Sequence, residues 1–190
     1  MSSPPEVSPD LLARVKQQDD AGCRELVDQL YPVLHRVVCR NLPRDTAPED
    51  ILQDVFVKIF SSIASFRGQQ PFGHWASRIA TLTCYDALRK QYRRPNLSFS
   101  DLPPEEVRAL QPSHSPHRDL EEKEASRALV DRLLATLNPR EQLVLRLSYL
   151  EELSTAEIQT ETGWSASKIK VTALRARQKL QKHLSQLPSS

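Results

Sequence analysis

Three aromatic side chains crowd into a short loop whose chemistry suits flat, negatively charged ligands. The stretch FRGQQPFGHW holds Phe66, Phe72 and Trp75 within ten positions, and one arginine and two glutamines stand between the first two rings. Aromatic rings stack on unpaired nucleic-acid bases with about 1–3 kcal/mol per base, and a positively charged groove tracks the backbone. The same spacing also suits rings packed in a core, and the loop taken alone favours the core.

Basic residues gather in two segments of the chain. From Arg78 to Arg94 there are five basic residues and one acid, and from Gly163 onward there are six basic residues and no acid. Between residues 101 and 124, seven acids outnumber three bases. Two basic segments separated by an acidic one predict two contacts with a polyanion. Two solvated helix faces are the alternative, but such faces usually mix both signs of charge.

The elements that must position these groups are helices. The chain holds only four glycines, and alternating apolar runs are scarce, which argues against strands. Apolar residues recur instead at helical spacing, and one such segment predicts a helix from about Phe72 to about Tyr92. The predicted apolar stripes are Leu26, Leu30, Val33, Leu34, Val37 and Val38; Ile51, Leu52, Val55, Phe56, Ile59 and Phe60; Leu129, Leu133, Leu134 and Leu137; and Leu143, Val144, Leu147 and Leu150. The sequence therefore predicts an all-α protein.

Prolines and acids divide the chain into two small helical domains. Residues 96–119 carry few periodic apolar residues and several prolines, so they predict a flexible acidic linker. The linker would join a domain at residues 8–95 to a second domain at residues 120–187. In the first domain, Thr46 is placed for a capping box at the start of a helix over residues 46–62.

Residues 153–180 carry the pattern of a helix-turn-helix motif. Ser154 and Ser165 are each placed to cap a helix, and Gly163 lies in the turn between the two helices. The first two turns of the second helix can reach base edges in a major groove, and later basic residues can hold the DNA backbone. The residues expected to contact duplex DNA are Ser165, Ser167, Lys168, Lys170, Val171, Thr172, Arg175 and Arg177. A basic surface helix in a plain helical bundle is the alternative.

Other kinds of chemistry find no support in the sequence. Cys23, Cys39 and Cys84 show no C-x-x-C spacing, so we expect small buried hydrophobes rather than disulfides or a zinc site. Without a Ser-His-acid set, a metal-ligand spacing or a glycine-rich phosphate loop, we expect no enzyme activity, cofactor or small-molecule substrate. No apolar run reaches the ~18 residues of a membrane span, and no secretory signal precedes the first helix, so a cytoplasmic location is expected.

The order of these segments resembles that of bacterial sigma factors. EDILQDVFVKIFSSIASFRG, FGHWASRIA and DALRKQYRR resemble sigma region two, and LATLNPREQLVLRLSYLEELSTAEI with the helix after it resembles sigma region four. No region three lies between them, which is the layout of the extracytoplasmic-function (ECF) group. The resemblance covers roughly residues 8 to 185. It implies a transcription initiation factor that binds core RNA polymerase, through the β′ and β subunits, and promoter DNA.

The resemblance also implies roles for individual residues. A face of the 46–62 helix would dock on a helical hairpin of β′ through Asp50, Gln53, Asp54, Phe56 and Lys58. Opening and capture of the −10 element would use Phe66, Arg67, Gln69, Gln70, Phe72, Trp75, Arg78, Leu82, Arg89, Lys90 and Arg93. The region-four residues named above would read the −35 element. Members of the family usually have an anti-sigma partner.

Some positions depart from the family pattern. Leu82 stands where the family usually has an asparagine near the captured base, which puts the identity of that base in doubt. Gln159 and Thr162 replace positions that are usually apolar, so we expect a looser first helix in the helix-turn-helix motif. Thr172 stands where an arginine is usual, so we expect one lost contact and a changed −35 preference.

Two other functions remain open at this point. A sigma-like decoy would bind an anti-sigma factor and never contact DNA, so it would have little need for two basic segments. A stand-alone helix-turn-helix repressor would bind duplex DNA without polymerase. Such a repressor would have no use for a base-capturing loop or for an acidic docking helix.

Overall fold

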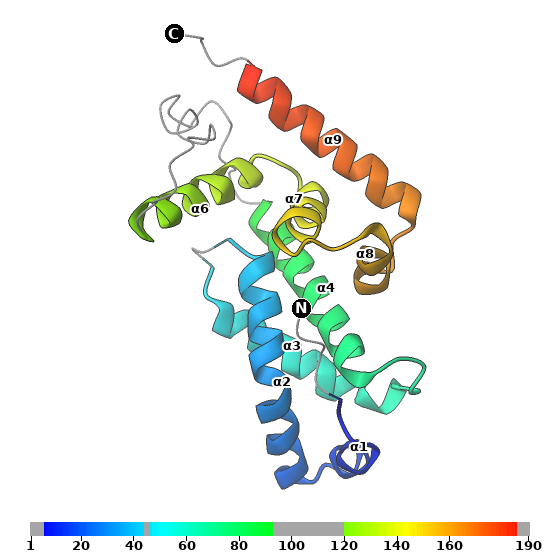
Figure 1. Ribbon diagram of the computed structural model, residues 1–190. Coiled ribbons are helices and arrows are strands. Elements are labelled where there is room, and N and C mark those ends of the chain that lie inside the picture. Colours follow the sequence, from blue (N-terminus) through cyan, green and yellow to red (C-terminus); the bar gives the residue numbers. More distant parts are fainter. Residues whose placement is uncertain (1–5, 44–45, 93–119, 186–190) are drawn as a thin grey trace.

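The computed structural model describes residues 6–43, 46–92 and 120–185, which form helices joined by turns and contain no strand (Figure 1). The N-terminal domain consists of α1 (Pro9–Lys16), α2 (Asp20–Asn41), α3 (Pro48–Ser62), the short 3-10 helix η1 (Ile63–Ser65) and α4 (Phe72–Tyr92). The C-terminal domain consists of α6 (Leu120–Ala135), α7 (Pro139–Leu145), the π-helical turn η3 (Arg146–Leu150), α8 (Thr155–Thr162) and α9 (Ala166–Ser185). The all-α prediction is confirmed, and the predicted linker lies outside the described residues.

The N-terminal domain is built on the packing of α2, α3 and α4 against one another. Leu26, Leu30, Leu34 and Val38 are at most 1% exposed and form the predicted inner stripe of α2. Burying side chains of this size contributes roughly 1.5–3 kcal/mol each relative to leaving them in water. The α2 stripe is therefore the main apolar support for α4, the helix that carries the first basic segment.

The start of α3 differs from the prediction. Pro48 occupies the first turn as expected, but the residue at the N-cap is Ala47, which offers no side-chain acceptor. Thr46 therefore lies one residue too early to cap the helix, and its backbone N–H donates to the Pro43 carbonyl at 3.1 Å. The predicted capping box at Thr46 is wrong, and the first-turn acids Glu49 and Asp50 complement the helix dipole instead.

The C-terminal domain begins its short helices with side-chain caps, of which the one at Ser154 was predicted. Asn138 and Glu141 form a reciprocal capping box at the start of α7. Ser154 caps α8 in the same way, and Gly163 ends α8 in the left-handed region at φ 71°. Only glycine adopts that conformation without strain. These local signals fix the geometry of the turn that leads into α9.

The helical turn after α7 contains a π-helical segment that the sequence did not reveal. An i→i+5 pattern inserts an extra residue and rotates the following side chains away from the regular apolar stripe. Leu143, Val144 and Leu147 are buried as predicted, whereas Leu150 is 46% exposed, so its predicted inward position is wrong. Tyr149 is 57% exposed for the same reason.

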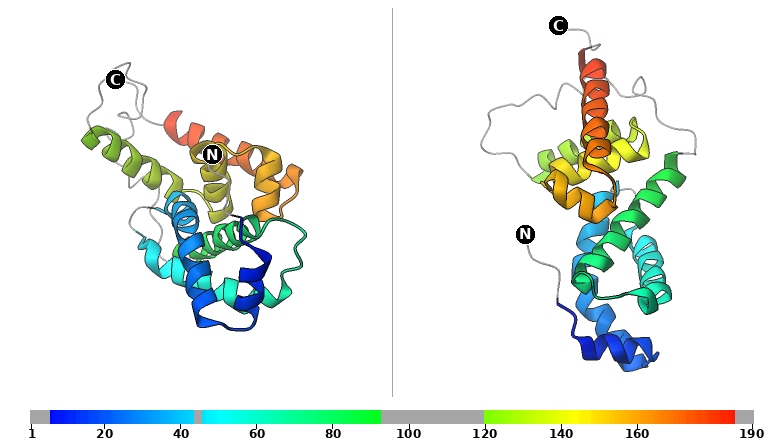
Figure 2. Two further views of the ribbon diagram at one scale, coloured as in Figure 1. Left: turned by 60° about the horizontal axis from the view of Figure 1, so that its bottom comes forward. Right: turned by 90° about the vertical axis from the view of Figure 1, so that its right-hand side faces the viewer.

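The two domains are in direct contact. Helix α4 packs on α7 and α8, and the end of α2 lies against η3. Figure 2 shows the yellow and orange helices of the C-terminal domain beside the green α4. One continuous cluster of buried apolar side chains includes residues of both domains, from Leu11 in α1 to Ile169 in α9. The described residues of the two domains therefore share a core.

Candidate polymerase and nucleic-acid surfaces

The aromatic loop divides into a packed part and an exposed part. The ring of Phe66 meets Phe72 edge-on at 5.0 Å between centroids and lies 5.3 Å from the ring of Trp75. Phe72 is 4% exposed, and Phe66 and Trp75 pack half-buried against the core. These three rings therefore form a wall that supports the loop.

The polar residues of the loop lie outside that wall. Arg67 and Gln69 are exposed, and Gln70 is half-buried. Gly68 between them has φ 71°, and a Cβ there would meet no atom within 4 Å, so the backbone conformation alone requires glycine. The Lys16 ammonium donates to the Phe66 carbonyl at 3.4 Å and ties the start of the loop to α1. The loop thus presents amide and guanidinium groups on a fixed base.

Helix α3 presents the predicted acidic face to solvent. Asp50, Gln53 and Asp54 are exposed. Phe56 is half-buried and stacks on Phe60 at 6.5 Å, so it supports the helix from within. Asp50 and Asp54 are one turn apart and can both face a cationic partner.

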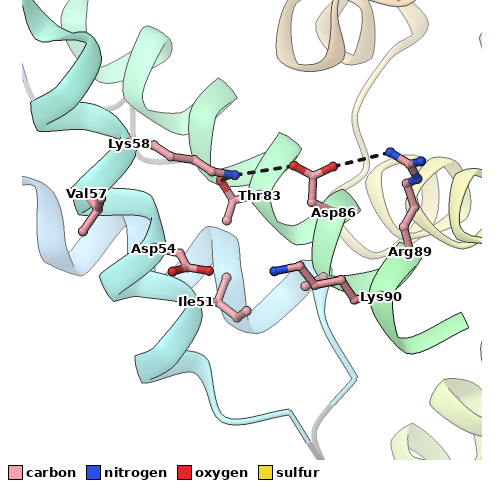
Figure 3. Close-up of a pocket in the computed structure, with 9 residues that line it drawn as sticks. Ile51, Asp54, Val57, Lys58, Thr83, Asp86, Arg89 and Lys90 are labelled. Carbon is pink, nitrogen blue, oxygen red and sulfur yellow. Dashed lines mark hydrogen bonds and ion pairs between the residues drawn. The ribbon is translucent and has the colours of Figure 1, made fainter. Parts of the chain in front are cut away.

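Lys58 differs from the other members of this face because it reaches across to α4. Its ammonium donates to the Thr83 hydroxyl at 3.1 Å and lies 3.5 Å from Asp86, which also pairs with Arg89 at 3.8 Å. Figure 3 shows this chain of charges along a groove of about 370 Å³ between α3 and α4. Lys58 therefore ties the acidic face to the basic helix.

Helix α4 carries the side chains predicted for the −10 contact, and of these Arg78, Leu82 and Arg89 are spaced to share one face of the helix. Arg78 and Leu82 are half-buried, and Arg89 and Lys90 are exposed. The Arg89 guanidinium lies 5.8 Å from the centre of the Tyr85 ring, within cation–π range. Arg93 lies outside the described residues.

The turn of the helix-turn-helix motif is held by hydrogen bonds. Buried Thr162 donates its hydroxyl to the Ile158 carbonyl at 2.6 Å and accepts the Trp164 backbone N–H at 3.2 Å. Ser165 accepts the Lys168 backbone N–H at 3.3 Å and starts α9 as predicted. Burying a polar group costs little free energy when its hydrogen bonds are satisfied. Thr162 therefore gives no sign that α8 is looser, as the sequence had led us to expect.

Most of the expected DNA-reading side chains of α9 are exposed. They are Ser167, Lys168, Lys170, Val171, Arg175 and Arg177, with Ser165 exposed just before the helix. The exception is Thr172, which is 9% exposed and faces inward. Thr172 therefore packs inside the domain. The other six α9 side chains remain exposed and available to contact DNA.

Sequence reasoning missed the residue at the centre of the domain contact. The half-buried ring of Trp164 meets the Tyr85 ring edge-on at 5.3 Å, with Arg140 at 5.5 Å and Lys168 at 5.1 Å from its centre. The position of this tryptophan directly after Gly163, which ends α8, was a sequence signal that could have pointed to the contact. The cysteines also differ from expectation, since Cys84 is buried but Cys39 is exposed.

Two family models match the chain. Sigma-70 region 2 matches residues 26–94, and Sigma-70, region 4 matches residues 127–180. These matches coincide with the helices that carry the loop, the acidic face and the helix-turn-helix motif. No described helix is long and apolar enough to span a membrane.

Curated relatives match nearly the whole chain. The RNA polymerase sigma factor YlaC of Bacillus subtilis is 31% identical over 165 residues, which are 85% of this chain and 93% of that protein. The ECF RNA polymerase sigma-E factor of Escherichia coli is 29% identical over 172 residues, covering 88% and 89%. The solved structure of CnrH in complex with the cytosolic domain of CnrY shares the fold, with a TM-score of 0.55 at 21% identity over 92% of this chain and 95% of CnrH. The chain therefore belongs to the sigma-70 family of RNA polymerase sigma factors and, within it, to the ECF group.

Proposed function

We propose that this sigma factor divides promoter recognition between its two domains. The C-terminal domain would read the −35 element, and the N-terminal domain would bind the β′ subunit and open the −10 element. The observation that carries the proposal is the exposed basic face of α9, which starts at a capped turn and contains no acid. As a transcription initiation factor, the chain supplies specificity while core RNA polymerase synthesises RNA.

In the proposed −35 contact, the start of α9 enters the major groove. Lys168, Lys170 and Val171 lie in its first two turns and are exposed. Lysine donates to guanine acceptors, and valine contacts a thymine methyl group. Arg175 follows about one turn after Val171, and Arg177 lies two residues further on. Both would hold phosphates, which adds affinity without sequence information.

In the proposed −10 contact, the outer residues of the loop capture an unpaired base. Arg67 and Gln69 have the exposure and the donors for this task, and Gln70 stands beside them. Extruding one base costs a few kcal/mol, which stacking and hydrogen bonds can offset. The buried wall behind the loop would keep these donors in place.

A matched pair of variants separates capture from support. Replacing both Gln69 and Gln70 with alanine should leave the melting temperature and core binding unchanged and impair −10 opening. Trp75→Ala should lower the melting temperature as well, since it removes a ring that contacts Phe66 and Phe72. Equal loss of stability in both variants would contradict this division of the loop.

The proposed polymerase contacts are the acidic face of α3 on β′ and the C-terminal domain on β. Asp50 and Asp54 are exposed and one turn apart, so both can pair with arginines of a basic helical hairpin. An anti-sigma factor is a further proposed partner, supported by membership in the ECF group.

Reconstituted transcription tests the proposal. Purified core RNA polymerase, this chain and a library of promoter fragments should give run-off transcripts that neither protein gives alone. An Asp50→Lys, Asp54→Lys variant should lose the transcript and its affinity for core polymerase, while keeping its α-helical circular dichroism. DNA binding without core polymerase and without transcript would instead favour a stand-alone repressor.

A further inference from the structure

Helix α2 carries a histidine and a cysteine one turn apart on its outer side. His35 and Cys39 are four residues apart, the spacing at which two side chains on one helix face can share a metal ion. Cys39 Sγ lies 3.6 Å from Nε2 and 3.7 Å from Nδ1 of the His35 ring. Cys39 is exposed and forms no disulfide, and His35 is half-buried. This pair belongs to none of the surfaces proposed above for DNA or polymerase.

The distance between these atoms fits a tetrahedral metal ion. Zinc is bound by cysteine sulfur at about 2.3 Å and by histidine nitrogen at about 2.0–2.1 Å, and its structural sites are almost always tetrahedral. Two such bonds at the tetrahedral angle place the sulfur and the nitrogen about 3.5 Å apart, whereas a linear arrangement would need about 4.3 Å. The 3.6 Å between Cys39 Sγ and His35 Nε2 therefore suits a tetrahedral ion. Because the second side-chain torsion of histidine is soft, the ring can turn one nitrogen toward it.

The charges around the pair favour a cation. Burial and, second to it, the charge of Glu49 in the first turn of α3 raise the pKa of the Cys39 thiol above its usual value. The same negative charge attracts a metal ion, which replaces the thiol proton because only the thiolate is a ligand. The neighbouring Arg40 already pairs with Glu151 at 2.7 Å, so its charge is balanced.

The pair supplies only half of the ligands that a structural zinc ion takes. Among the residues that the structure describes, no three or more histidine, cysteine or acidic side chains are grouped so that they could hold a metal. A second copy of the chain, related by a two-fold axis, brings an identical pair, and the two pairs make a Cys₂His₂ set. Tyr31 stacks on His35 at 5.6 Å and is 43% exposed, so its ring lies where that copy would cover it. Aromatic side chains of this kind are enriched at protein interfaces.

We propose that His35 and Cys39 form half of a zinc site that two copies of the chain complete. The ion joins the α2 helices of the two copies through two sulfur and two nitrogen ligands. Each thiol releases its proton to water as its sulfur–zinc bond forms. Zinc thus controls the assembly of the chain, a property that does not depend on the proposed promoter contacts.

Sedimentation of the full-length chain, reduced and freed of metal with a chelator, tests the shared site. One zinc ion for every two chains should double the sedimenting mass, and fresh chelator should reverse the change. Cys39→Ser and His35→Ala should keep their α-helical circular dichroism and lose this response. Cys23→Ser is the matched control, because it makes the same change at a half-buried cysteine of the same helix, and it should respond as the wild type does.

Cobalt(II) in place of zinc reads the ligands themselves. Its tetrahedral thiolate complexes absorb visible light and add a sulfur-to-metal charge-transfer band in the near ultraviolet. Both absorptions should appear in the wild type and in Cys23→Ser and should be absent from Cys39→Ser.

Three results would overturn the proposal. A chain that binds no zinc has no site, and one zinc ion per chain on a monomer means that the site is not shared. A zinc-dependent dimer that survives in Cys39→Ser or His35→Ala means that other side chains bind the metal.

Discussion

The contact between the two domains should strengthen as the pH falls, because of one carboxylate. The described arrangement, in which α8 packs on α4 and the Thr81 hydroxyl donates to Glu161, is called the closed form, and a chain whose domains have separated is called the open form. Burial raises the pKa of Glu161 to about 6 from its usual 4.5, although the Thr81 hydroxyl and the Arg78 charge lower it and the Glu151 charge raises it. The closed form therefore favours neutral Glu161. The stabilisation is complete below pH 4.5 and is lost as the pH rises through about 6.

The size of the effect follows from the pKa difference between the closed and open forms. If Glu161 regains its usual pKa on opening, the closing constant changes by at most about 30-fold, or about 2 kcal/mol. Between pH 7.5 and pH 5.0 the same two pKa values give an increase of about eightfold. An open fraction of one half at pH 7.5 would then fall to about one tenth at pH 5.0.

Scattering curves measured from pH 7.5 to 5.0 and fitted as mixtures of a closed and an open form give the closing constant. Glu161→Gln is the control, because its amide stays neutral and can still accept the Thr81 hydroxyl. The wild-type closing constant should rise about eightfold and that of the control should stay constant. A wild-type closing constant that falls as the pH falls, or one that changes no more than that of Glu161→Gln, would refute the role given to Glu161.

Two further predictions concern the C-terminal domain. Lys170→Ala should change the preferred −35 sequence in a binding-site selection. Arg175→Ala should weaken binding to all promoters alike and lower the slope of log affinity against log salt concentration by about one. Identical behaviour of the two variants would contradict the assignment of Lys170 to base recognition and Arg175 to phosphate binding. Asp131→Ala should cost about 3–5 kcal/mol in urea unfolding, because it strands the charge of Arg146, which is 2% exposed and lies 2.6 Å from Asp131. Arg146→Met should cost far less, and equal losses would argue against this account of the pair.

Local signals made much of the fold predictable. The α4 helix runs from Phe72 to Tyr92 as its periodicity predicts, and Ser154, Gly163 and Ser165 act as caps and helix end. These features depend on neighbours in the sequence, so a single sequence contains the information. The exposed polar residues of the loop and of α9 were predictable for the same reason.

The misses arise where packing overrides the local pattern. The π-helical turn moves Leu150 to the surface, and the inward register of Thr172 gives it a core position. Contact between Tyr85 and Trp164 depends on how two domains meet across a segment outside the described residues. No periodicity encodes that meeting, so the closed arrangement could be found only in the structure.

The central claim is that this chain makes core RNA polymerase open a promoter at −10. Permanganate footprinting of promoter DNA with core polymerase and the chain together tests it most directly, since permanganate reacts with unpaired thymines. The account predicts reactive thymines near −10 that require both proteins and that weaken when Gln69 and Gln70 are replaced with alanine. Promoters that bind the complex and show no reactive thymines would contradict it.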